Sequence, residues 1–175
     1  FRQAAVLLKL IREMFPKARK MVVFHRGFMQ RPFRQHRGMT TRNLKLAAYA
    51  RLQGFQTINA AGSTRKLNLY DQCDLHVGYR VHAHLDFLSR RKASLLLQED
   101  ARGVGQSLTL GTDDVDARHR DAIEQVRRRL REHLDRRFEG FHAVTQTMQQ
   151  KYRVMVRFLK SMPGTAAEAM ERQTT

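Results

Sequence analysis

The feature that most constrains the fold is a repeated change of hydrophobic period along the N-terminal part of the chain. Apolar residues at helical spacing over residues 4–14 give way to a continuous apolar run at Met21–Phe24. Helical patterns recur over residues 40–53, 67–73 and 80–91, and strand-like runs recur at 55–60, 75–78 and 93–97. Strands that alternate with helices through short connections pair in parallel and are covered on both faces. We therefore expect an α/β protein of Rossmann-like type, with a parallel sheet of about four strands flanked by helices.

The C-terminal part of the chain has a helical pattern only. An apolar stripe from Ile123 to Phe138 predicts one long amphipathic helix, and a second runs from Phe141 to about Met162 after the break at Gly140. The expected organisation is a Rossmann-like domain over residues 1–112, two long C-terminal helices over 113–162 that pack on the same domain, and a polar tail over 163–175.

The charge of the chain indicates an anionic partner. Its 33 Lys and Arg residues face only 16 Asp and Glu, so the formal net charge is +17. A field of this strength attracts nucleic acid, a membrane surface, an anionic polysaccharide or a phosphate-bearing substrate, and does not choose among them. The single cysteine, Cys73, excludes an intramolecular disulfide and a zinc cluster of the cysteine type, which favours a reducing cytoplasm.

No segment of the sequence is expected to cross a membrane. The most apolar stretch near the N-terminus, Ala4–Ile11, contains Lys9 and is far shorter than the roughly 20 residues that a spanning helix needs. We expect a cytoplasmic protein, with peripheral attachment to the inner face of the membrane left open. The chain begins at Phe1 and enters a helical pattern at once, so a fragment that lacks an N-terminal domain is also expected.

A candidate binding segment lies where the third strand meets the following helix, at Gly78–His84. In open parallel sheets, ligands bind outside the carboxyl ends of the strands. The first helical turn supplies backbone N–H groups to an anion, and Arg80 adds a fork of donors. Two further strand ends, His25–Gly27 and Asp100–Gly103, should open on the same edge. Basic groups from three loops are therefore predicted to converge.

The run from Leu69 to Gly111 resembles the signature of the polysaccharide pyruvyl transferase family. It has an aspartate before an apolar strand, a Gly-x-Arg-x-His-Ala element, an apolar helix, a second strand and an Asp-x-Arg-x-x-Gly turn. These pieces fall on Asp74, Gly78, Arg80, His82, Ala83, Asp100, Arg102 and Gly105. The resemblance implies the second half of a glycosyltransferase-B-like fold. The chain departs from the family at Ser89–Ala93, where a Gly-hydrophobic-Pro step is usual, so the donor pocket is expected to differ there.

The family transfers a pyruvyl group from phosphoenolpyruvate to a sugar hydroxyl of a polysaccharide or glycoconjugate. The resemblance implies phosphoenolpyruvate as donor substrate, a glycan or glycolipid acceptor, and neither a cofactor nor a metal. His82 would bind phosphate or deliver a proton as the catalytic residue, because imidazole titrates near neutral pH. The expected substrate-binding residues are Arg80, His25, Arg26, Asp100 and Arg102.

Other interpretations stand beside this one. His82 could instead cap its helix, and a structural role is expected for His84, which lies two positions away and so cannot share a metal with His82. A domain of the same architecture could bind a nucleotide sugar. A basic module could bind nucleic acid through residues 16–37, which interleave basic and aromatic side chains. The arginines of residues 127–131 are interspersed with acids, which is typical of a solvated helix face and disfavours nucleic acid.

Overall fold

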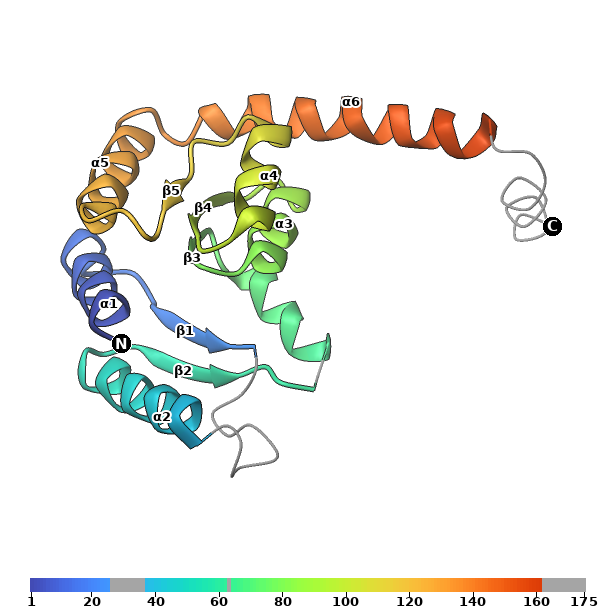
Figure 1. The fold of residues 1–175 in the computed structure, drawn as a ribbon. Coiled ribbons are helices and arrows are strands. Elements are labelled where there is room, and N and C mark those ends of the chain that lie inside the picture. The colour runs from blue at the N-terminus through green and yellow to red at the C-terminus, as the bar shows by residue number, and fades with distance from the viewer. Residues whose placement is uncertain (26–36, 63, 162–175) are drawn as a thin grey trace. The chain divides into compact units, whose positions relative to one another are not determined.

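The computed structural model describes residues 1–25, 37–62 and 64–161, and the fold is α/β as the sequence predicts (Figure 1). The chain divides into two compact units. Unit 1 comprises Phe1–Cys73 together with Ile123–Arg127, and unit 2 comprises Asp74–Ala122 together with the chain from Arg128 onward. Each unit holds its own parallel sheet and is described by itself.

Unit 1 contains a two-stranded parallel sheet between helices. Val22 of β1 lies opposite Thr57 of β2. Leu8, Ala50 and Phe55 form a buried apolar cluster that joins the two helices to the start of β2. The elements of the unit are α1 (Arg2–Met14), β1 (Met21–Phe24), α2 (Arg37–Leu52), β2 (Gln56–Asn59) and the 3₁₀ helix η1 (Thr64–Gln72).

Unit 2 is built on a three-stranded parallel sheet of order β3-β4-β5. The central strand is an almost continuous apolar run, and Leu95, Leu96 and Leu97 are at most 1% exposed. A strand buried on both faces has this composition. The elements are β3 (Leu75–Gly78), α3 (Val81–Ser89), β4 (Ala93–Gln98), α4 (Ala101–Leu110), β5 (Val115–Asp116) and α6 (Gly140–Ser161), while α5 (Ala122–Asp135) contributes residues to both units.

The first half of α6 packs on α3 and α4 (Figure 1). Val144 is buried there with Leu88 of α3 and Leu110 of α4, and Phe141 and Met148 close the cluster. The two C-terminal helices are therefore present as predicted, and the apolar stripe of α6 is a packing surface over this part of its length.

The structure differs from the sequence-based expectation in the strands. We expected one sheet of about four strands, whereas the five strands of the described residues form one sheet of two and one of three. The additional strand, β5, is only two residues long, so it has no period that a sequence could display. Helix α4 was also missed, because the positions that it buries include Gly103 and Ser107 and therefore form no apolar stripe.

The turn between α3 and β4 has an unusual residue. Arg91 adopts φ 58°, the left-handed conformation that glycine adopts without strain. Its N–H donates to the carbonyl of Leu88 at 2.9 Å, and the N–H of Lys92 donates to the carbonyl of Phe87 at the same distance. The helix therefore ends in a glycine-type turn that is made here by an arginine.

No helix within the described residues is long and apolar enough to cross a membrane. The arginines of α5 form the surface pairs that the sequence predicts: Arg127 pairs with Glu124 at 3.3 Å, and Arg128 and Arg129 both pair with Glu132.

Candidate functional site

The carboxyl edge of the sheet in unit 2 is the candidate site. Because β3, β4 and β5 run parallel, the residues that follow Gly78, Gln98 and Asp116 leave the sheet at one edge. Tyr79 and Glu99, which follow two of these strands, lie near enough for the carboxylate to act on the phenol. Burial, and secondarily Glu99, raises the pKa of Tyr79 to about 12. Tyr79 therefore stays protonated at neutral pH and can act at this edge as a donor.

Arg80 and His82 occupy the start of α3 at this edge. Arg80 is the N-cap residue in an extended conformation, and its carbonyl accepts from the N–H of His84 at 2.9 Å. No side chain caps this turn. Arg80 and His82 are both exposed, and neither side chain is paired with any residue in the described part of the chain. The turn thus presents a guanidinium, an imidazole and the positive end of the helix dipole to solvent.

Asp100 and Arg102, at the end of β4, are occupied by one another. Asp100 caps α4 by accepting from the N–H groups of Arg102 at 3.1 Å and Gly103 at 3.4 Å. The Arg102 guanidinium donates to the same carboxylate through Nε at 3.1 Å and Nη2 at 2.5 Å. The hydrogen bond from the Arg102 side chain is the largest cause that lowers the pKa of Asp100. The pair builds the turn, and its charges largely cancel.

The end of β5 repeats this arrangement. Asp116 accepts from the N–H of Arg118 at 2.9 Å and from its Nε and Nη2 at 3.0 Å. The hydrogen bond from the Arg118 side chain leads the causes that lower the pKa of Asp116. Two neighbouring strand ends therefore use the same Asp-x-Arg turn.

The remaining predicted residues lie elsewhere in the chain. His25 follows β1 in unit 1, where its Nε2 lies 2.8 Å from the hydroxyl of Tyr70. Arg26 lies outside the described residues. Of the three loops expected to converge, the structure brings together the two of unit 2, which carry Arg80 and Asp100.

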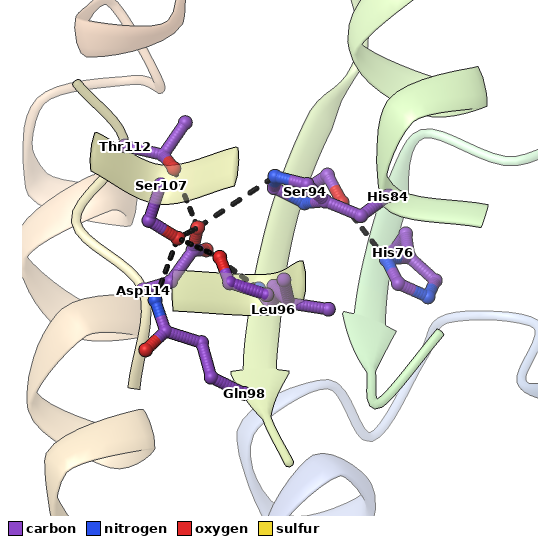
Figure 2. Close-up of polar contacts among 9 residues, drawn as sticks. His76, His84, Ser94, Leu96, Gln98, Ser107, Thr112 and Asp114 are labelled. Atoms are coloured by element: carbon purple, nitrogen blue, oxygen red, sulfur yellow. Dashed lines mark hydrogen bonds and ion pairs between the residues drawn. The ribbon is translucent and has the colours of Figure 1, made fainter. Parts of the chain in front are cut away.

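A buried polar network joins β3, β4, α3 and α4 to the segment before β5 (Figure 2). The Ser94 hydroxyl of β4 lies 2.8 Å from Nδ1 of His76 and 2.8 Å from Nδ1 of His84. His84 Nε2 lies 3.7 Å from Oδ2 of Asp114, and both side chains are at most 1% exposed. His84 is therefore structural, as its sequence context predicts, and burial lowers its pKa while Asp114 opposes that shift.

Asp114 anchors the network to the sheet and to α4. Its Oδ1 accepts from the N–H of Leu96 at 2.8 Å. Its Oδ2 accepts from the hydroxyls of Ser107 at 2.6 Å and Thr112 at 2.5 Å. A group that only accepts behaves as an ionised carboxylate. Asp114 thus supplies the acceptors for one backbone N–H of β4 and for two hydroxyls at the end of α4.

The negative charge of Asp114 favours one direction for the hydrogen bonds of this network, although its 3.7 Å separation from Nε2 of His84 is longer than a hydrogen bond. A proton on His84 Nε2 faces the carboxylate of Asp114, whereas a lone pair there would be repelled by it. Nδ1 of His84 then accepts from the Ser94 hydroxyl, which has only one proton to give. In this arrangement the Ser94 oxygen accepts from Nδ1–H of His76. The charge of Asp114 therefore favours the tautomer of His76 with its proton on Nδ1, and His76 is half-buried in β3.

Gly78 makes room for this histidine. A Cβ at position 78 would lie 3.0 Å from Nε2 of His76. Sequence reasoning missed His76, Ser94 and Asp114, because their proximity depends on the register that places His76 opposite Ser94. The available signal was a polar residue inside each of two otherwise apolar strands.

No protein-family model, curated protein or solved structure matches this chain. Within the described residues, no three His, Cys, Asp or Glu side chains gather as they would around a metal ion. The assignment of a chemistry therefore depends on the sequence motif and on the geometry of the edge.

Proposed function

We propose that the carboxyl edge of unit 2 binds phosphoenolpyruvate, and that the chain is a pyruvyl transferase-like enzyme acting on a sugar of a polysaccharide or glycoconjugate. The observation that carries the proposal is the pair Arg80 and His82. Both lie exposed in the uncapped first turn of α3, without a partner among the described residues.

The chemistry of the donor fits this turn. Phosphoenolpyruvate carries a phosphate and a carboxylate, which suit a guanidinium fork and the N–H groups of a helix start. In the transfer, an acceptor hydroxyl bonds to the central carbon and loses its proton, and the methylene carbon gains one. Phosphate then leaves with the electron pair of its bond to that carbon as a second hydroxyl of the same sugar closes the ketal, and the proton of this hydroxyl leaves with the phosphate. His82 would pass the proton between these positions.

The pairing of the other arginines supports Arg80 as the main cation of the site. Arg102 is neutralised by Asp100, and Arg118 is neutralised by Asp116. Both turns give the edge its shape and add little net charge. Arg80 is the basic residue of the motif that retains its charge for a ligand.

Calorimetric titration of the whole chain with phosphoenolpyruvate tests the proposal. Saturable binding is expected, with a loss of about tenfold or more in Arg80→Ala, because a hydrogen-bonded charge is removed. His82→Ala should also weaken binding. Both residues are exposed, so the far-UV circular dichroism should not change. Arg131→Ala, which removes an exposed arginine of α5, is the matched control and should bind as the unmodified chain does.

Two other ligands decide between the alternatives. A nucleotide sugar that binds at the same edge, while phosphoenolpyruvate does not, would refute the proposal in favour of a glycosyltransferase-B-type donor site. Binding of single-stranded DNA with a steep salt dependence, with neither small ligand bound, would instead indicate a basic binding module.

A further inference from the structure

Helix α6 changes its surroundings along its length. Its first half is packed on α3 and α4 through Val144 and Met148. The helix then continues beyond these two helices of unit 2 (Figure 1). We call residues 149–161 the exposed half of α6.

The exposed half of α6 carries large apolar side chains in solvent. Five of them are between 38% and 63% exposed: Tyr152, Val154, Met155, Phe158 and Leu159. At 100° per residue, these side chains and Val156 span an arc of roughly 200° around the helix. Met155 and Leu159 continue the stripe that Val144 and Met148 bury further back. An apolar face of this width is typical of a helix that is covered by something else.

Basic residues occupy the opposite side of the same segment. Arg153, Arg157 and Lys160 fall within a sector of roughly 60°. Lys151 falls within the apolar arc, between Phe158 and Met155, where its long aliphatic stem can carry the charge outward. Helix α6 contains no Asp or Glu from Gly140 to Ser161.

We propose that the exposed half of α6 docks on the surface of an anionic lipid bilayer. A helix with a basic polar face and an apolar opposite face lies in the interface, with its apolar side chains among the lipid chains and its cations at the headgroups. A second copy of the chain is disfavoured as occupant, because it would bring the same cations together without an acid in α6 to pair with them. The proposal concerns a different element from Arg80 and His82 and does not depend on the donor.

A single-tryptophan experiment tests where the apolar face goes. The sequence contains no tryptophan. In the full chain, Phe158→Trp should shift its emission to the blue on vesicles of phosphatidylcholine with phosphatidylglycerol, and lipids brominated on the acyl chain should quench it. Leu108→Trp, at an 81% exposed position of α4, is the control and should show neither effect.

Flotation with the same vesicles separates the contribution of this helix from the charge of the whole chain. The triple variant Arg153→Gln, Arg157→Gln, Lys160→Gln should lose roughly 100-fold in the partition coefficient. The control triple variant, Arg42→Gln, Lys45→Gln, Arg131→Gln, removes three exposed charges elsewhere and should bind within a few-fold of the unmodified chain. Met155→Ser combined with Phe158→Ser should lose about tenfold or more while all charges remain.

Several results would overturn the proposal. Equal flotation with pure phosphatidylcholine would exclude recognition of anionic lipid. Unchanged binding of the Met155 and Phe158 variant, or equal losses in the two triple variants, would assign binding to general charge attraction. Absence of flotation, together with a dimer that the Met155 and Phe158 variant abolishes, would assign the face to a second copy.

Discussion

Removal of the Asp114 carboxylate should destabilise unit 2 far more than removal of a neighbouring acid. The carboxylate accepts from the N–H of Leu96 and from the hydroxyls of Ser107 and Thr112. In Asp114→Ala, the N–H of Leu96 is left without an acceptor inside a residue that is 0% exposed. The Ser107 hydroxyl keeps the carbonyl of Gly103 at 3.1 Å as an alternative acceptor.

The expected magnitude follows from this inventory. A buried group left unsatisfied costs about 1–3 kcal/mol, and the loss of the charge facing His84 adds to it, so Asp114→Ala should cost roughly 2–4 kcal/mol. For a chain of this size, this lowers the unfolding midpoint by roughly 4–16 °C. Asp114→Asn keeps one carbonyl oxygen for the N–H of Leu96 and should cost less than the alanine variant. It should also lower the pKa of His84 further, because the opposing charge is gone.

Urea and thermal unfolding followed by circular dichroism measure these differences. Asp116→Ala is the matched control, since this carboxylate is two positions away but exposed and paired with Arg118 on the surface. It should change the free energy of unfolding little. A loss below about 1 kcal/mol for Asp114→Ala would mean that water replaces the carboxylate, and would refute the account of a buried hub.

Three further results are expected. Burial lowers the pKa of His84 below 6.5, so the unfolded chain binds a proton at a pH where the folded chain does not. The free energy of unfolding should therefore fall as the pH drops below about 6.5, by up to about 1.4 kcal/mol per pH unit. Urea midpoints that do not change with pH in this range would contradict the prediction. The pKa of the Tyr79 phenol is raised to about 12, so Tyr79 should not contribute to the absorbance change of tyrosines near pH 10. The chain and its Tyr79→Phe variant should therefore show the same absorbance change there. Gly111 and Arg91 both have positive φ at helix ends. In urea denaturation, Gly111→Ala should therefore lower the free energy of unfolding by about 1 kcal/mol, and Arg91→Gly should raise it by a similar amount. Changes of the same sign in the two variants would contradict this reasoning.

The alternation of periods was sufficient to predict the fold class. Met21–Phe24 and Leu75–Gly78 are strands with the predicted bounds. A short apolar run between two helices of an α/β domain is usually buried as a strand of the sheet. β5 was not predictable, because two residues show no periodicity. Helix α4 was not predictable from an apolar stripe, since one of the positions that it buries is Ser107, whose hydroxyl donates to Asp114 and accepts from Gln98.

The candidate site was predictable in part. The position of Arg80 and His82 at a helix start follows from the order of elements. The pairing of Asp100 with Arg102 does not follow from the order of elements. It depends on the extended backbone of Asp100, φ −148° and ψ 176°, which turns the carboxylate toward the start of α4. Likewise, only the strand register places His76 opposite Ser94.

The two Asp-x-Arg turns have a consequence for association kinetics. A chain of charge +17 suggests strong long-range attraction of any anion. At physiological ionic strength, however, charges beyond about 8 Å are largely screened. The arginines after β4 and β5 are already compensated within their own turns. The rate at which a small anion reaches this edge should therefore depend on ionic strength much less steeply than a net charge of +17 suggests.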